Sequence, residues 1–176
     1  AARARKIATG PGDAPGIEMG PVITCAARDR ITGLIDRGVA EGAKLVVDGR
    51  RPAIAGHPNG YFVGPTLFDG VTPAMTIYRE EIFGPVLCVV RSESPGDAIR
   101  LVNADPYANG AAVFTRSGHA ARVFQQDGEI GMAGGNVSRS RCRWRSSASA
   151  AGATRCSATC TCTAWTVSAS TRARRS

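Results

Sequence analysis

The sequence predicts an α/β fold in which helices flank a mainly parallel sheet. Two continuous apolar runs, at residues 86–91 and 111–115, are typical of strands covered on both faces. Segments with apolar residues at helical spacing alternate with these runs, and segments rich in Gly and Pro separate them. This alternation is the pattern of a parallel sheet with a helical layer on each side.

The first predicted helix begins after a loop rich in Gly and Pro. Thr24 is predicted to cap it, because a threonine hydroxyl can accept a hydrogen bond from the first turn. Gly42 is predicted to end it, because glycine readily adopts the left-handed conformation that follows many helices. The inward face is expected to consist of apolar residues at helical spacing: Ile31, Leu34, Ile35 and Val39.

Two strand-like segments follow this helix. Residues 44–47 are predicted to form a short strand, and residues 50–60 a polar loop. Residues 61–68 are also strand-like. Pro65 within them indicates a sheet edge or an irregularity, because proline cannot donate a hydrogen bond to a neighbouring strand.

A second helix is predicted to begin near Pro95, since proline suits the first turn of a helix. Its inner face is expected to consist of Ala98, Ile99, Leu101 and Val102. The remaining predicted elements are a strand at 111–115, a helix at 118–126 and a strand at 131–137.

The charge of the chain is unevenly distributed. The 176 residues carry 22 Lys+Arg and 14 Asp+Glu, which gives a formal net charge of +8. All 14 acidic residues lie within residues 1–137, together with 14 basic residues, so this part is neutral on balance. The excess lies in residues 138–176 and consists of arginine. Any inference from the high pI to nucleic acid therefore concerns those residues alone.

Residues 138–176 are expected to form an irregular or disordered tail, because they contain no Leu, Ile, Phe or acidic residue. We interpret them as a frameshifted reading: in a shifted frame, their codons can give a PIPVP run directly after Asn136-Val137. The tail contains four cysteines, at Cys142, Cys156, Cys160 and Cys162. Their spacing lacks the paired CxxC pattern of a zinc knuckle, so no metal site is predicted.

The segment EEIFGPV at residues 80–86 offers groups that can bind a sugar. The carboxylate of Glu81 can accept hydrogen bonds from two vicinal hydroxyl groups, as in a ribose. Phe83 supplies a flat apolar wall, and Gly84 and Pro85 fix the turn. On spacing alone, so short a motif favours the simpler interpretation of an acidic turn before a buried strand.

The wider run YREEIFGPVLCVVR resembles the cofactor-binding segment of the NAD(P)-dependent aldehyde dehydrogenases. GPVITCAARDRITGLIDRGVAEGAKLVVDG and NADPYANGAAVFTRSGHAARVFQ follow that family in order. YFVGPTLFDGVTP is most similar to its CoA-acylating branch, the methylmalonate-semialdehyde dehydrogenases. The resemblance covers residues 1–137 and implies that they are a fragment of the family's catalytic domain.

The resemblance also implies roles for the motif. It implies that Glu81 accepts hydrogen bonds from the nicotinamide ribose of NAD and that Phe83 flanks this ribose. Glu80 would be a structural neighbour, salt-bridged to Arg79 or elsewhere. The implied cofactor is NAD, the implied substrate is a semialdehyde, and CoA is the implied co-substrate.

The resemblance places the catalytic nucleophile, a cysteine that forms a thioester, upstream of this chain, so no catalytic residue is expected here. Cys25 is expected at the start of a surface helix. Cys88 is expected inside a buried strand, where a thiol packs as a small hydrophobe. His57 and His119 are expected to have ordinary surface roles.

Three functional hypotheses remain open. The chain is an inactive fragment of a semialdehyde dehydrogenase, or the accessory half of a split dehydrogenase, or a nucleic-acid-binding module with a basic tail. The third has little support, because only Trp144 and Trp165 interleave with the arginines of the tail. The parent enzyme is expected to be a cytoplasmic homo-oligomer, without a membrane span or signal peptide.

Overall fold

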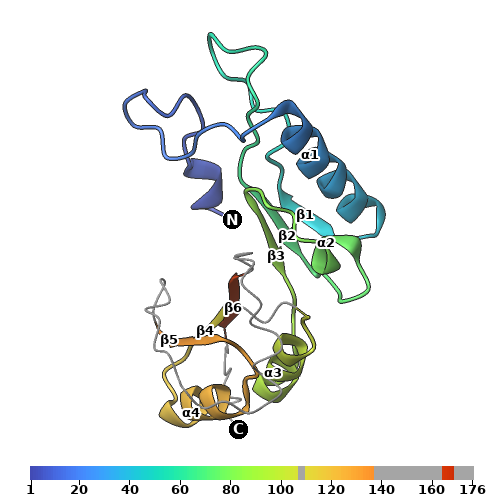
Figure 1. The fold of residues 1–176 in the computed structure, drawn as a ribbon, viewed down its shortest axis with the longest axis vertical. Coiled ribbons are helices and arrows are strands. Elements are labelled where there is room, and N and C mark those ends of the chain that lie inside the picture. The colour runs from blue at the N-terminus through green and yellow to red at the C-terminus, as the bar shows by residue number, and fades with distance from the viewer. Residues whose placement is uncertain (107–109, 137–163, 169–176) are drawn as a thin grey trace, which may run out of the picture. The chain divides into compact units, whose positions relative to one another are not determined.

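The computed structural model describes residues 1–106, 110–136 and 164–168, the last segment by its backbone only. The chain divides into two compact units, Ala1–Arg91 and Ser92–Ser176. Figure 1 shows a mixture of helices and strands in both units. Each unit is described by itself.

The first unit contains one long helix and a three-stranded sheet. The sheet has the order β1-β2-β3, in which β1 is antiparallel and β3 parallel to β2. The elements are, in order, η1 (Ala4–Lys6), α1 (Cys25–Ala40), β1 (Lys44–Val47), β2 (Thr66–Asp69), α2 (Thr76–Arg79) and β3 (Val86–Val89).

The second unit also contains a three-stranded sheet, with the order β5-β4-β6 and both pairings parallel. The elements are α3 (Pro95–Asn103), β4 (Gly110–Phe114), α4 (Gly118–Asp127), β5 (Met132–Gly135) and β6 (Ala164–Ser168). The predicted α/β class with mainly parallel strands is confirmed.

Residues 138–176 were expected to be irregular or disordered, and within them the described residues form one short strand, β6. Trp, Thr and Val within β6 favour extended backbone, and β4 supplies the hydrogen-bonding partner that a sequence pattern does not reveal. The four cysteines of the tail lie outside the described residues.

Both predicted ends of α1 are confirmed. The Thr24 hydroxyl accepts a hydrogen bond from the Ala27 N–H at 3.0 Å. The helix ends at Ala40, and Gly42 has a φ of +92°. One inward residue was predicted wrongly: Val39 is exposed, and Gly38 is buried in its place. Gly38 fits because a Cβ there would lie 2.8 Å from Ile77 Cδ1.

The core of the first unit lies between α1 and its sheet. Ile31, Ile35 and Phe68 are completely buried at its centre. Other buried members are Ala43, Val63, Val71, Ile77 and Ile82. Burial of α1 along one face fixes its rotation, and therefore fixes which of its residues can reach the segment between α2 and β3.

Two strand predictions need correction. Residues 61–65 are not part of a strand, because the ladder of β2 begins only at Thr66, whose N–H donates to Pro85 O at 2.8 Å. The run at 86–91 is not buried on both faces, since Leu87 in β3 is 60% exposed. In the described part of the chain β3 has β2 as its only strand neighbour.

The backbone passes very close to itself where residues 61–65 meet the end of β1. The Gly64 N–H donates to Gly49 O at 2.7 Å, and the Gly49 N–H donates to the Thr66 hydroxyl at 3.1 Å. A Cβ on Gly49 would lie 2.0 Å from Gly64 O. This approach therefore requires glycine at position 49.

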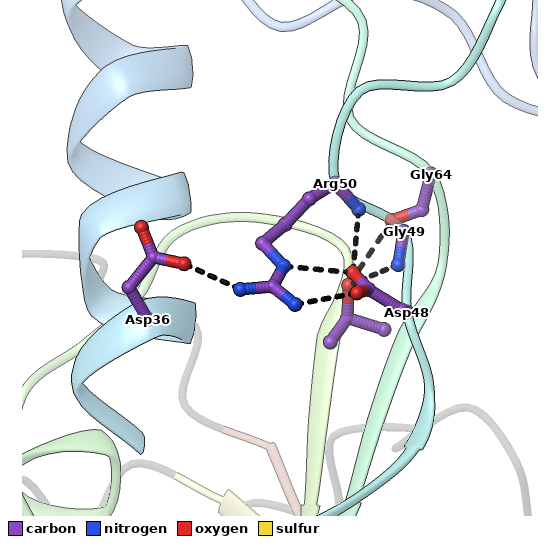
Figure 2. Close-up of polar contacts among 6 residues, drawn as sticks. Asp36, Asp48, Gly49, Arg50 and Gly64 are labelled. Atoms are coloured by element: carbon purple, nitrogen blue, oxygen red, sulfur yellow. Dashed lines mark hydrogen bonds and ion pairs between the residues drawn. The ribbon is translucent and has the colours of Figure 1, made fainter. Parts of the chain in front are cut away.

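Arg50, which follows Gly49 in the chain, stabilises this close approach of the two segments through its side chain. Figure 2 shows the Arg50 guanidinium between Asp48 and Asp36, which lies on α1. It contacts a carboxylate oxygen of each aspartate at 2.5 Å. Hydrogen bonds from Arg50 hold the pKa of Asp48 below its usual range. The network ties the end of β1 to the helix.

Candidate functional site

The candidate site is the segment that joins α2 to β3, residues 80–85, which we call the acidic-aromatic turn. Its sequence, EEIFGP, combines two carboxylates, one aromatic ring and two turn-forming residues. All of its positions belong to the first unit.

The short helix α2 is held by a side chain from the end of α1. The Glu41 carboxylate accepts hydrogen bonds from the Thr76 N–H at 2.7 Å and from the Thr76 hydroxyl at 2.5 Å. These bonds keep the pKa of Glu41 below its usual range. An isolated four-residue helix is marginal in water, so this contact fixes the start of the segment that leads into the turn.

The two carboxylates of the turn differ in exposure. Glu80 is exposed and Glu81 is half-buried. The suggested salt bridge between Glu80 and Arg79 is absent from the described residues, where Arg79 Nε instead donates to Pro73 O at 3.1 Å. In the same part of the chain, no hydrogen bond or ion pair involves the Glu81 carboxylate. It is therefore available to accept hydrogen bonds from a ligand.

Phe83 has an unusual conformation for an aromatic residue. Its side chain is 73% exposed and its φ is +50°. Left-handed backbone is strained for any residue with a Cβ, and a bulky side chain rarely adopts it. Strained residues of this kind cluster at ligand-binding sites. The turn thus presents an exposed ring next to an available carboxylate.

Gly84 allows the turn to lie directly on α1. A Cβ at this position would lie 2.7 Å from Ile31 Cδ1, and Ile31 is completely buried. The Gly84 carbonyl accepts a hydrogen bond from the Val86 N–H at 2.7 Å. These contacts fix the path of the backbone between Phe83 and β3.

The conformation of Phe83 leads to a prediction about stability. Phe83→Gly is expected to be more stable than Phe83→Ala by about 1 kcal/mol, because only alanine keeps the Cβ that strains a positive φ. Native-state hydrogen exchange of α1 amides in the two variants measures the difference. At Arg37, within α1, the same pair should show the opposite order. Equal stability of the two Phe83 variants would contradict the strain.

The other candidate residues of the sequence lie outside the acidic-aromatic turn. Cys25 is exposed at the first position of α1. Cys88 is half-buried in β3, and burial raises the pKa of its thiol to about 11, which suits packing and not nucleophilic attack. His57 is exposed, with its ring edge-on to Phe62, and His119 is exposed near the start of α4.

Sequence reasoning missed one residue that contacts the turn. Arg30, on α1, donates from Nη1 to Glu81 O at 3.1 Å and from Nη2 to Ile82 O at 2.5 Å. It lies 51 and 52 residues from its partners, so no local pattern could reveal the contact.

The described residues contain no group of three or more His, Cys, Asp or Glu side chains that could hold a metal ion. Among these same residues, no helix is long and apolar enough to cross a membrane.

Comparisons with known proteins indicate one family. The profile of the aldehyde dehydrogenase family matches residues 1–152. A malonate-semialdehyde dehydrogenase of Pseudomonas aeruginosa is 58% identical over 128 residues, which are 73% of this chain and 26% of that protein. The acylating methylmalonate-semialdehyde/malonate-semialdehyde dehydrogenase of mouse mitochondria is 47% identical over 135 residues, 77% of this chain and 25% of that protein.

The fold has relatives among solved structures as well. The NAD+ complex of an aldehyde dehydrogenase from Bacillus cereus superposes with a TM-score of 0.71 and 32% identity, over 77% of this chain and 27% of that one. This chain thus spans about a quarter of the length of the curated relatives it matches.

Proposed function

Because this chain belongs to the aldehyde dehydrogenase family, we propose that it supplies the nicotinamide-ribose contacts of an NAD-dependent semialdehyde dehydrogenase. The observation that carries the proposal is the pairing, within three residues, of the available Glu81 carboxylate with the exposed, strained Phe83 ring. The NAD+ complex of the Bacillus cereus relative supports NAD as the cofactor class.

The residues of the turn fit a ribose chemically. The two hydroxyl groups of a ribose diol are donors, and the carboxylate of Glu81 is an acceptor with no partner among the described residues. Phe83 offers a flat face toward solvent, against which a sugar or a nicotinamide ring can pack. The carboxylate fixes the rotation of the sugar, and the ring limits its lateral movement.

Bound NAD would supply the hydride acceptor for aldehyde oxidation. The part of Glu81 and Phe83 is to hold the nicotinamide ribose in one orientation, so that the reacting atoms meet at a productive distance. We propose a semialdehyde of the malonate or methylmalonate type as substrate. The names of the relatives support this class, and the word acylating in the mouse name supports CoA as the acceptor of the acyl group.

We further propose that this chain is inactive without the rest of an aldehyde dehydrogenase polypeptide. The cysteine nucleophile of the family is expected upstream of the matched segment, and neither Cys25 nor Cys88 occupies the acidic-aromatic turn. Whether the remainder is supplied by the same chain or by a second one, the acidic-aromatic turn would have the same role. The intact enzyme is expected to be a cytoplasmic homo-oligomer.

Glu81→Gln tests the proposed role. In a chimera, the 128-residue matching segment of the Pseudomonas aeruginosa enzyme is exchanged for the corresponding residues of this chain. The substitution is expected to slow hydride transfer about 10- to 100-fold, the range for loss of a charge-assisted hydrogen bond. Single-turnover NADH formation measures the rate, and circular dichroism checks the fold.

Glu80→Gln is the matched control, because it makes the same chemical change one residue away on an exposed side chain. It is expected to leave the hydride-transfer rate unchanged. Equal rates for Glu81→Gln and Glu80→Gln would refute the proposed role of Glu81.

A further inference from the structure

One arginine holds two consecutive backbone carbonyls of the acidic-aromatic turn. The Arg30 guanidinium donates from Nη1 to Glu81 O and from Nη2 to Ile82 O, at 3.1 and 2.5 Å. A planar guanidinium with two donors fixes both the position and the direction of the two peptide groups. These are the peptide groups on either side of Ile82, between the Glu81 carboxylate and the Phe83 ring.

The next residue of α1 supports the same turn from the core side. Ile31 is completely buried and lies where a Cβ of residue 84 would be, so the turn packs against it through Gly84. Arg30 and Ile31 therefore hold the turn at both ends of Phe83, whose φ of +50° costs free energy. A strained backbone conformation persists only where several surrounding contacts hold it in place.

We propose that Arg30 is a positioning residue for the acidic-aromatic turn: it fixes the direction in which the Glu81 carboxylate and the Phe83 ring face the cofactor. This inference rests on the proposed function of Glu81 and extends it to a residue of α1 that touches neither the cofactor nor the reacting atoms. Without the two hydrogen bonds, the peptide groups beside Phe83 can rotate toward less strained backbone.

A purely structural role for Arg30 predicts a different result. The side chain is exposed, but its contact with Ile82 O is part-buried, so its loss is also expected to cost some stability. If Arg30 only stabilised the fold, its loss would lower the thermal midpoint and would leave the KM for NAD unchanged in the folded fraction. A positioning residue instead raises the KM for NAD, lowers the hydride-transfer rate, or both, at temperatures where the protein is fully folded.

The experiment uses Arg30→Met and Arg30→Lys in the chimera defined above. Arg30→Met removes both hydrogen bonds and is expected to reduce kcat/KM for NAD about 10- to 100-fold, because small misplacements of binding groups have effects of this size. Arg30→Lys keeps the charge but loses the planar fork, and should restore only part of the loss. Arg37→Met is the control: it lies on the same helix, and among the described residues it donates no hydrogen bond to the turn.

A double-mutant cycle with Glu81→Gln separates the possible outcomes. Because Arg30 acts partly through Glu81, the loss of kcat/KM in the double variant should be clearly smaller than the product of the two single losses. Full additivity of the two losses, or an Arg30→Met variant as active as Arg37→Met, would overturn the positioning role while leaving that of Glu81 intact. A Glu81→Gln variant that transfers hydride as fast as Glu80→Gln would instead overturn the proposed function itself.

Discussion

Replacing Gly49 by alanine is expected to lower the free energy of unfolding of the first unit by about 3 kcal/mol, the upper part of the range for overpacking a closed site. The added Cβ would lie 2.0 Å from Gly64 O and 2.8 Å from Pro65 O, both backbone atoms that cannot rotate away. Relief of the clash must separate the two segments, which also breaks the 2.7 Å hydrogen bond between Gly64 N–H and Gly49 O.

Native-state hydrogen exchange of the Ile31 and Ile35 amides in the 176-residue chain measures this loss, because both residues lie in the core of the first unit. Gly33→Ala is the control. Gly33 lies within α1 and no atom is within 4 Å of an added Cβ, so this variant should be more stable by up to about 1 kcal/mol. If Gly49→Ala lowers the free energy of unfolding and Gly33→Ala raises it, the close approach at Gly49 is the cause of the loss. Unchanged protection in Gly49→Ala would contradict it.

Phe68→Ala is expected to cost about 3–5 kcal/mol, because it removes a completely buried ring from the centre of the core. Phe68 lies on the central strand β2, and its ring also approaches α1, where Phe68 Cζ is 3.2 Å from the Cβ that Gly38 would carry. The loss should therefore loosen the sheet and the helix together. Exchange of α1 amides and far-UV circular dichroism during denaturation report both effects.

Phe83→Ala is the matched control for this prediction. It removes the same ring from a position that is 73% exposed, so its effect on the free energy of unfolding should be below about 1 kcal/mol. A similar loss from the two substitutions would show that the ring of Phe68 is not the centre of the core.

Sequence patterns predicted the elements whose signals are local. The Thr24 cap, the glycine with a positive φ after α1, and Pro95 at the start of α3 each act within a few residues of the chain. Ser94 Oγ accepts a hydrogen bond from the Asp97 N–H at 3.1 Å, which completes the start of α3 in the same local way.

The features that the sequence patterns did not predict share one physical cause: each depends on contacts between segments that are distant in the chain. Helix α2 was not predicted, because its stabilising partner, Glu41, lies 35 residues away from Thr76. The exposure of Leu87 depends on which strands pair with β3, and an apolar run contains no information about its neighbours. The strand at β6 likewise depends on pairing with β4.

The sequence motif identified the acidic-aromatic turn, but it did not identify the arginine that holds the turn in place. The motif indicated Glu81 and Phe83 because carboxylates and aromatic rings have recognisable chemistry. Arg30 resembles any other surface arginine of an amphipathic helix until the fold places it beside two carbonyl groups. Whether Glu81 and Phe83 contact a nicotinamide ribose stays a prediction.

The left-handed backbone of Phe83 has a consequence for laboratory evolution of this protein. A library selected only for survival of heat should accumulate glycine at position 83, since glycine removes the strain at no cost to the core. A library of the chimera, selected for turnover, should keep the aromatic ring. The two selections should therefore enrich different residues at position 83: glycine under heat and an aromatic residue under turnover. The frequencies of these residues after each round would show which selection is stronger.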